Sequence, residues 1–310
     1  MTADSAGRRR VVVVGSSNMD LVIRVPRLPA PGETLAGHDF VTAPGGKGAN
    51  QAVAAARLGA PVTFVSAVGD DAFGRTLLAG FAADGIDTSR VRTVAGTPTG
   101  VALVTVDAEG RNTIVLSPGA NATLGAAAVA AAEADIAQAA LVLCQLETPL
   151  SVLLATLDVA QRHQVPVLLN PAPAAPLTAD VLRRVRFLVP NESEAAVLSG
   201  VPVIDLPSAQ HAAAALRARG AADVLVTLGA GGVWQADGEG GRHHPAPHVE
   251  AVDTTAAGDT FIGGLAAELA AGVPLAAAIA FGQRAAALAV TRHGAQASIP
   301  GRAEVEAFLR

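Results

Sequence analysis

The chain has 310 residues and a formal net charge of −5, with 51% hydrophobic and 16% charged residues. This composition excludes an intrinsically disordered chain and provides enough apolar residues for one large domain spanning 1–310. The single cysteine, Cys144, excludes an internal disulfide framework and suits a reducing compartment, so we expect a cytoplasmic protein.

The first predicted element is a strand at Val11–Val14, preceded by Arg8, Arg9 and Arg10. This apolar run is too short for a signal peptide. We interpret the arginines as a solvated tail, and we expect no nucleic-acid partner because the chain has no other basic cluster. No membrane association is expected either, since polar and turn-forming residues interrupt the uncharged stretch Asn112–Ala132.

Beyond the first strand, apolar β-branched runs alternate with alanine-rich helical stretches. Further strands are predicted at Val62–Ser66, Leu141–Gln145, Val165–Leu169, Phe187–Val189 and Val224–Thr227. Helices are predicted at Lys47–Leu58, Ala72–Ala83, Ser151–His163, Ser208–Arg219, Ala257–Ala271, Leu275–Thr291 and Ala303–Leu309. Strands separated by helices of this length are typical of βαβ units. The predicted fold class is therefore α/β, with a mostly parallel central sheet covered on both faces.

Two pairs of strands break this alternation. Leu21–Val25 and Thr34–Val41 flank one turn-rich segment, and Val101–Val106 and Thr113–Leu116 flank another. Hairpins inside an α/β chain indicate a small antiparallel sheet apart from the main one, built from about 18–44 and about 96–118. A lid over a site, a structural flap and a dimer surface are all open interpretations of this sheet.

The segment 253–260 reads Asp-Thr-Thr-Ala-Ala-Gly-Asp-Thr and leads into a predicted helix. Small residues at Ala256, Ala257 and Gly258 allow backbone N–H groups at the helix start to point toward a phosphate. Asp259 then lies in the first turn, where it could deprotonate a neighbouring hydroxyl. The helix dipole predicts a low pKa for this carboxyl. Stabilisation of a helix N-terminus is the alternative role.

The segment 45–50 reads Gly-Gly-Lys-Gly-Ala-Asn at another predicted helix start. Gly46 and Gly48 permit close approach of the backbone, while Lys47 and Asn50 supply an ammonium and an amide for a hydroxyl-rich ligand. The spacing is not that of a Walker A loop. Lys47 is the only lysine in the chain, which favours a site that needs a compact charge. A glycine-rich turn selected for backbone geometry is the alternative.

Three further polar residues follow predicted strands. Asn18 and Asp20 come after the first strand, and Glu147 comes after Leu141–Gln145. Ligands of parallel sheets collect beyond the carboxyl ends of the strands, so these side chains are candidates for binding sugar hydroxyls. Turn formation and a surface carboxylate are the alternative interpretations.

Asn191 and Glu194 follow the predicted strand Phe187–Val189 with the spacing of a capping box. A phosphate contact by Asn191 and a metal held through water by Glu194 form an equally open interpretation. The glycine-rich segment Thr227–Gly232 follows the next strand, where its backbone could approach a nucleotide.

Together these segments resemble the PfkB-type carbohydrate kinases, and among them the ribokinase group. The segments that carry the resemblance occur in the order of that family and are 31–34 (Pro-Gly-Glu-Thr), 45–55, 145–147 (Gln-Leu-Glu), 170–173 (Asn-Pro-Ala-Pro), 191–194, 253–259 and 294–296 (Gly-Ala-Gln). The resemblance extends from about Val11 to Leu309, nearly the whole chain.

The resemblance implies a three-layer, ribokinase-like sandwich and ATP-dependent phosphorylation of the 5-hydroxyl of D-ribose. It implies that Asp259 is the general base and that the backbone N–H groups of Ala256, Ala257 and Gly258 form an anion hole. The residues implied for the sugar are Asn18, Asp20, Gly46, Lys47, Gly48, Asn50, Glu147 and Asp259. Those implied for ATP are Asn191, Thr227, Leu228, Gly229, Ala230, Gly231, Gly232, Gly258 and Gln283, with Glu194 organising Mg²⁺ through water.

The resemblance also implies a potassium ion beside the anion hole, held mostly by backbone carbonyl groups. The matching residues are Asp253, Thr255, Ala289, Arg292, Gly294 and Ser298. Lids of this family often pair edge to edge, so we expect a homodimer. The sequence departs from the family at Gln283, where relatives carry Asn or His near the adenine, and at Ala230-Gly231, which replaces a more polar pair.

Two rival functions remain. A sister kinase would act on deoxyribose, fructose, a nucleoside or a keto-deoxy sugar acid. The low aromatic content of 3% disfavours a nucleoside pocket, while Arg24, Arg27 or Arg111 could serve a sugar acid. A non-catalytic sugar sensor is the other rival, and the presence of Asp259 and Gly258 favours an enzyme over it.

Overall fold

The computed structural model describes residues 9–308, and within that part nine strands form the main sheet in the order β13-β12-β11-β10-β9-β8-β1-β4-β5. Their bounds are β1 (Val11–Val14), β4 (Val62–Gly69), β5 (Val91–Val94), β8 (Leu141–Cys144), β9 (Val167–Leu169), β10 (Phe187–Leu188), β11 (Asp223–Thr227), β12 (Val233–Asp237) and β13 (Gly240–His244). All neighbours from β5 to β11 pair in parallel, and β12 and β13 add an antiparallel hairpin at one edge. The predicted mostly parallel sheet is confirmed.

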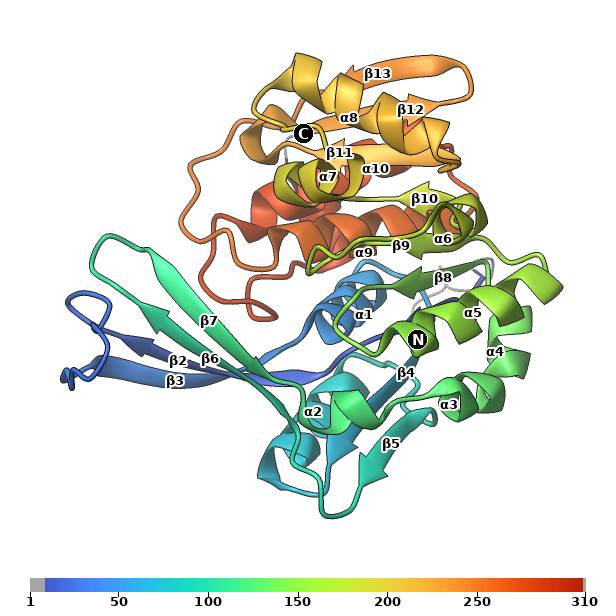
Figure 1. Cartoon of the computed structure of the whole chain (residues 1–310). Helices are drawn as coiled ribbons and strands as arrows, with labels where there is room; N and C mark the ends of the chain where they lie inside the picture. Colours follow the sequence, from blue (N-terminus) through green and yellow to red (C-terminus); the bar gives the residue numbers. More distant parts are fainter. Residues whose placement is uncertain (1–8, 309–310) are drawn as a thin grey trace.

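Helices cover both faces of this sheet, as Figure 1 shows. One apolar core contains residues of α1 (Lys47–Arg57), α2 (Ala72–Ala83), α9 (Ala257–Ala270), α10 (Leu275–Ala289) and α11 (Arg302–Ala307). The other contains residues of α3 (Ala126–Ala131), α4 (Glu133–Ala137), α5 (Leu150–Arg162), α6 (Ala179–Arg184), α7 (Glu192–Ser199) and α8 (Leu206–Ala218). Alternate strand residues enter opposite cores, as Val12 and Val13 of β1 do. The predicted three-layer α/β sandwich is confirmed.

A small second sheet projects from one side of the main body (Figure 1). It has the strand order β3-β2-β6-β7, with β2 (Asn18–Arg24), β3 (His38–Gly45), β6 (Gly100–Val106) and β7 (Asn112–Ser117). The two predicted hairpins are antiparallel, and the β2–β6 pair that joins them is parallel. The strand expected at Thr34–Val41 begins and ends later, because its pairing with β2 extends to Gly45 opposite Asn18. That register places Asn18 beside Gly45, so the segment that starts β2 and the glycine-rich segment before α1 lie side by side.

The sequence patterns did not indicate several short elements. The structure adds the helices α3, α4, α6 and α7, the edge strand β5 and the hairpin of β12 and β13. The last helix, expected at Ala303–Leu309, covers Arg302–Ala307, and Leu309 lies outside the described residues. Among the described residues, no helix combines the length and apolar character needed to cross a bilayer.

Of the N-terminal arginines interpreted as a solvated tail, Arg9 is exposed and Arg10 is partly exposed, but both have partners on the main body. Arg9 donates a hydrogen bond to the carbonyl oxygen of Ala139 at 3.1 Å. Arg10 forms an ion pair with Asp87 at 3.0 Å. Both side chains therefore hold the start of β1 against its neighbours, while Arg8 lies outside the described residues.

Candidate active site

Asp259 lies in the first turn of α9 and is only 8% exposed. Its Oδ2 accepts a hydrogen bond from Asn50 Nδ2 at 3.0 Å, and its Oδ1 accepts one from Gln51 Nε2 at 2.9 Å. Both donors belong to α1, whose small residues allow it to pack closely against α9; a Cβ added at Gly263 would lie 2.3 Å from the Ala54 side chain. The structure thus joins the predicted base to the predicted sugar-binding amide.

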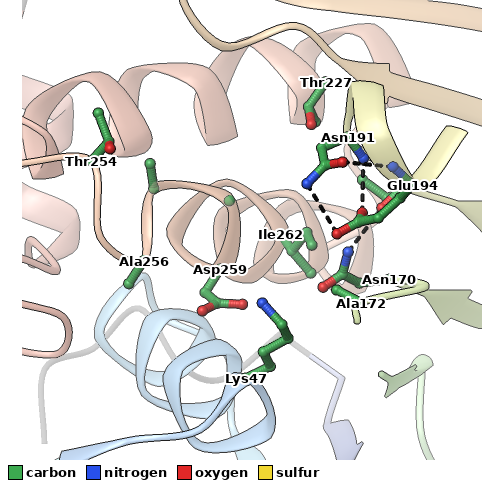
Figure 2. Close-up of a pocket in the computed structure, with 13 residues that line it drawn as sticks. Lys47, Asn170, Ala172, Asn191, Glu194, Thr227, Thr254, Ala256, Asp259 and Ile262 are labelled. Carbon is green, nitrogen blue, oxygen red and sulfur yellow. Dashed lines mark hydrogen bonds between the residues drawn. The ribbon is translucent and has the colours of Figure 1, made fainter. Parts of the chain in front are cut away.

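The direction in which the pKa of Asp259 is shifted differs from the sequence-based expectation. Burial raises the pKa of its carboxyl, the nearby Lys47 ammonium and the amides of Gln51 and Asn50 lower it, and the Glu147 charge raises it. The net direction is upward, so the predicted low pKa is wrong, because loss of hydration outweighs the charge-stabilising groups. Figure 2 shows the Lys47 and Asp259 side chains projecting toward each other from α1 and α9.

The glycine-rich turn before α1 is fixed by tight backbone contacts. Gly46 has φ of 90°, a conformation that favours glycine. A Cβ on Gly48 would lie 2.5 Å from the backbone nitrogen of Ser16. The Glu147 carboxylate holds this turn, since its Oε2 accepts hydrogen bonds from the Lys47 backbone N–H at 2.9 Å and from Ser16 Oγ at 2.6 Å. Glu147 is therefore an anchor of the helix start rather than a free surface carboxylate.

Asn18 and Asp20 reach this region from β2. Asn18 is buried, and its Oδ1 accepts a hydrogen bond from Asn121 Nδ2 at 2.8 Å. Burial, together with the charges of Glu147 and Asp259, raises the pKa of Asp20 to about 7, against the lowering effect of Lys47. Asp20, Glu147, Asp259 and the single lysine thus form one electrostatic cluster.

Lys47 supplies positive charge to this cluster of carboxylates. Burial lowers the pKa of its ammonium, but the charges of Asp259, Glu147, Glu194 and Asp20 raise it by more, so the net direction is upward. The ammonium therefore keeps its proton and partly neutralises the carboxylates.

A cavity of about 220 Å³ opens beside Asp259 (Figure 2). Its lining residues are Lys47, Asn170, Ala172, Val189, Asn191, Glu194, Thr227, Thr254, Ala256, Ala257, Gly258, Asp259 and Ile262. The cavity therefore unites the predicted base and anion hole with part of the predicted nucleotide set. Asn18, Asp20, Asn50 and Glu147 do not line it. Of these, Asn50 is hydrogen-bonded to Asp259, and Glu147 accepts from the Lys47 backbone N–H.

The predicted anion hole has one N–H already engaged. Ala256 adopts a left-handed conformation with φ of 57° at the N-cap of α9, and the Ala257 N–H donates to the Thr254 carbonyl oxygen at 3.2 Å. A Cβ on Gly258 would meet no atom within 4 Å, so space is open at that point. A phosphate oxygen would therefore compete with the Thr254 carbonyl for the Ala257 N–H.

Both open interpretations of Asn191 and Glu194 have structural support. The capping box is formed: Asn191 Oδ1 accepts from the Glu194 N–H, and the Asn191 N–H donates to Glu194 Oε2, each at 2.9 Å. Both side chains also line the cavity (Figure 2), and burial raises the pKa of Glu194. A carboxylate that lines a polar cavity fits a water-mediated Mg²⁺ site.

The remaining nucleotide candidates are not gathered in the cavity. Of the segment Thr227–Gly232 only Thr227 lines it, while Leu228 and Gly231 line a separate groove beside Ile204. Gln283 is buried on α10, and its Nε2 donates to the His244 carbonyl oxygen at 2.8 Å.

The predicted cation residues are partly brought together. The Asp253 carboxylate accepts hydrogen bonds from the backbone N–H groups of Thr255 and Gly294, both at 2.9 Å, and this joins the segment before α9 to the one after α10. Ala289 and Ser298 flank the second segment, although the Arg292 side chain is paired with Glu304. Among the described residues no group of three or more His, Cys, Asp or Glu side chains is arranged so that it could hold a metal ion.

Sequence reasoning assigned no role to several buried polar residues of the site. They are Ser16, Gln51, Asn121, Gln145, Asn170 and Gln296. The family resemblance was an available signal for four of them, because its segments contain Gln51, Gln145, Asn170 and Gln296. Ser16 and Asn121 had no such signal, because their partners are over 100 residues away.

Comparison with known proteins gives the family. The model of the pfkB family carbohydrate kinases matches residues 8–302. The chain belongs to this family. A ribokinase of Haemophilus influenzae is 47% identical over 302 residues, covering 97% of this chain and 99% of that protein. A ribokinase of Schizosaccharomyces pombe is 43% identical, with 96% of each chain covered.

Solved structures agree with the fold of this pfkB family member. The ribokinase of Arabidopsis thaliana complexed with ribose and ATP superimposes with a TM-score of 0.90 at 32% identity, covering 97% of this chain and 98% of that chain. The Thermotoga maritima ribokinase gives a TM-score of 0.88 at 38% identity, covering 97% and 99%.

Proposed function

We propose that this protein transfers the terminal phosphoryl group of ATP to the 5-hydroxyl of D-ribose, giving D-ribose 5-phosphate and ADP. The observation that carries the proposal is the position of Asp259, which lines the cavity and also accepts the hydrogen bond of Asn50. Support also comes from the similarity to ribokinases along almost the whole chain.

In the proposed step, Asp259 accepts the proton of the 5-hydroxyl while the hydroxyl oxygen attacks the terminal phosphorus. The bond to the bridging oxygen breaks and ADP leaves. The backbone N–H groups of Ala256, Ala257 and Gly258 stabilise the charge on the transferred group, once the Ala257 N–H has exchanged the Thr254 carbonyl for phosphate oxygen. The raised pKa of Asp259 brings this base closer to working pH.

The sugar would lie among Asn18, Asp20, Lys47, Asn50 and Glu147, with the backbone of Gly46 and Gly48 alongside. Glu147 uses Oε2 to hold α1, which leaves Oε1 to accept from a hydroxyl. Asn18 uses its Oδ1 toward Asn121, which leaves its amide N–H groups to donate. The site would then offer both donors and acceptors to the sugar, as hydroxyl groups that donate and accept require.

The nucleotide would extend from Gly258 over Asn191 and the segment Thr227–Gly232 toward Gln283. Glu194 would hold Mg²⁺ through water, and that ion supplies charge neutralisation at the transferred phosphoryl group. The residues proposed for K⁺ are Asp253, Thr255, Ala289, Arg292, Gly294 and Ser298, which would fix the geometry of the segment before α9.

The small sheet would serve as a lid of a single kinase domain and as a dimer surface. Lid closure would exclude water from the transferred phosphoryl group. Six large apolar side chains of the sheet are exposed by 46–64%: Phe40, Val41, Leu103, Ile114, Val115 and Leu116. By the strand register, Leu103 and Val115 lie on one face of the sheet, and Val41, Ile114 and Leu116 lie on the other. Exposed apolar side chains on a projecting sheet fit burial against a second copy of the chain.

The test is ADP release from MgATP and K⁺ with D-ribose, 2-deoxyribose, fructose and adenosine compared by kcat/KM. We expect D-ribose to exceed the others by about tenfold or more, which is about 1.4 kcal/mol of discrimination. A deoxyribokinase of Salmonella typhi is 36% identical over 300 residues, so 2-deoxyribose is the closest competitor. Preference for another sugar would leave the phosphoryl-transfer step in place and show that the proposed sugar specificity is wrong. No turnover in a folded protein would favour the sugar-sensor function.

A further inference from the structure

Two chains of buried amide side chains converge on the Asp259 carboxylate. In the first, Gln145 Nε2 donates to Gln51 Oε1 at 2.6 Å, and Gln51 Nε2 donates to Asp259 Oδ1 at 2.9 Å. In the second, Gln296 Nε2 donates to Asn50 Oδ1 at 3.2 Å, and Asn50 Nδ2 donates to Asp259 Oδ2 at 3.0 Å. Each carboxylate oxygen is thus held by an amide that is itself held by another amide.

Gln51 differs from Asn50 in its position relative to the ligands. Its side chain is 0% exposed on α1, and it does not line the cavity. Its Nε2 also donates to Asn170 Oδ1 at 3.1 Å, so both amide N–H groups and the carbonyl oxygen have partners. A side chain with this complete set of bonds has no group left to bind a sugar or a nucleotide.

The outer amide determines which end of Gln51 faces the base. Because Gln145 donates to Oε1, the Gln51 amide must present its N–H groups to Asp259 and Asn170. A flipped amide would place an oxygen against the Asp259 carboxylate and leave a buried donor without a partner. Gln145 lies close to the backbone of Gly15, where an added Cβ would be 2.1 Å from its Oε1, and the hydrogen bond to Gln51 is the one that its buried amide makes among the described residues.

We propose that Gln51 is a positioning residue for phosphoryl transfer: it fixes the orientation of the Asp259 carboxylate through a hydrogen bond whose direction Gln145 enforces. The proposal rests on the proposed function in taking Asp259 as the base. Gln51 lies outside the cavity and donates to Asp259 as well as to Asn170, so we expect its loss to affect mainly the chemical step, through Asp259, and to leave ligand binding nearly unchanged.

The test is steady-state kinetics of Gln51→Met, which keeps the length of the side chain and removes the amide. We expect kcat to fall about 10- to 100-fold, as small misplacements of a reacting group do, with KM for ribose and for ATP within about threefold of the parent values. The matched control is Gln235→Met, because Gln235 is a buried glutamine on β12 that donates to the Asp237 carboxylate at 2.7 Å, outside the site. The control should lose stability without losing kcat, and a Gln51→Met kcat within threefold of the parent value would overturn the proposal.

A second variant and a double-mutant cycle separate positioning from damage to the fold. Gln145→Met removes only the outer link, and we expect a kcat loss in the same direction but smaller. In an Asp259→Asn background, Gln51→Met should lower the residual turnover less than about threefold, since its effect passes through the carboxylate. An undiminished effect in that background, or a Gln145→Met kcat equal to the parent value, contradicts the proposal. If Asp259→Asn itself keeps full turnover, the proposed function fails instead.

Discussion

The backbone N–H of Lys47 donates to Glu147 Oε2 at 2.9 Å across 100 residues of sequence. This bond joins the start of α1 to the end of β8, and the same oxygen accepts from Ser16 Oγ at 2.6 Å. One carboxylate therefore both fixes the glycine-rich turn and contributes charge beside Asp259. Stability and ribose binding should depend on it together.

Glu147→Ala should lower the free energy of unfolding by about 1–3 kcal/mol, because two buried donors lose a charged acceptor. It should also raise KM for ribose at least about tenfold. Urea unfolding and steady-state kinetics measure the two effects. The control Glu133→Ala removes a carboxylate that pairs with Arg162 on the surface at 2.7 Å, and it should cost below about 1 kcal/mol. Equal stability losses in the two variants would contradict this role of Glu147.

Asp20 gives the protein a defined pH dependence. Its pKa of about 7 lies above the ordinary value of 3.8 for an aspartate, so between those pH values the folded state holds a proton that the unfolded state lacks. The free energy of unfolding contributed by this group therefore falls as pH rises through that window and is fully lost above it. Asp20→Asn should unfold at a higher temperature than the parent protein at pH 8, with a smaller difference at pH 4.5.

The same substitution should weaken ribose binding, because a neutral amide oxygen accepts a weaker hydrogen bond from a hydroxyl than a carboxylate does. We expect a KM for ribose about tenfold higher. Thermal unfolding at pH 8 and pH 4.5 measures the change in stability, and steady-state kinetics at pH 8 measures the change in KM for ribose. An Asp20→Asn variant that is less stable than the parent protein at pH 8 would contradict the prediction. It would show that burial of the ionised Asp20 carboxylate does not destabilise the folded protein.

Asp253 should control activation by potassium. Its carboxylate holds the N–H groups of Thr255 and Gly294, so Asp253→Asn loosens the loop that would offer carbonyl groups to the ion. We expect equal turnover in Na⁺ and K⁺ for this variant and a clear preference for K⁺ in the parent protein. Asp180→Asn, at a carboxylate that is 65% exposed on α6, should keep the K⁺ preference. A parent protein that is equally active in both salts would refute the potassium site.

The exposed apolar side chains of the small sheet should mediate dimerisation. Val115 on β7 is 64% exposed, and Val115→Asp should convert a dimer to a monomer in sedimentation experiments. Ile204→Asp is the matched control, because Ile204 is 87% exposed but lies on the main body near α8. A monomeric parent protein, or dimers that survive Val115→Asp, would refute this surface.

The sequence predicted the main architecture because its signals are local. Runs such as Val11–Val14 and the helix that begins at Lys47 appear in the structure almost at their predicted bounds. Short helices such as α6 and the hairpin of β12 and β13 escaped prediction, since tertiary packing rather than a long periodic pattern stabilises them. The parallel β2–β6 pairing, which joins the two hairpins, depends on partners about 80 residues apart and has no local signature.

In the candidate site too, features with a local sequence signal could be predicted and features that depend on tertiary packing could not. The motif residues Asp259, Asn50 and Lys47 could be chosen from the sequence because glycine-rich and small-residue runs mark their helix starts. The raised pKa of Asp259 could not, since burial by α1 outweighs the helix dipole. The engagement of the Ala257 N–H with Thr254 likewise depends on the left-handed Ala256, which no sequence pattern indicates.

The most direct measurement is the turnover of Asp259→Asn with MgATP and D-ribose, together with its ribose affinity by calorimetry. We predict a kcat lower by at least about a thousandfold, since the variant lacks the proton acceptor and its amide cannot assume that role. Ribose affinity should stay within about tenfold, because Asn18, Asp20 and Glu147 remain in place. A variant that retains a tenth or more of the parent turnover would contradict the central claim.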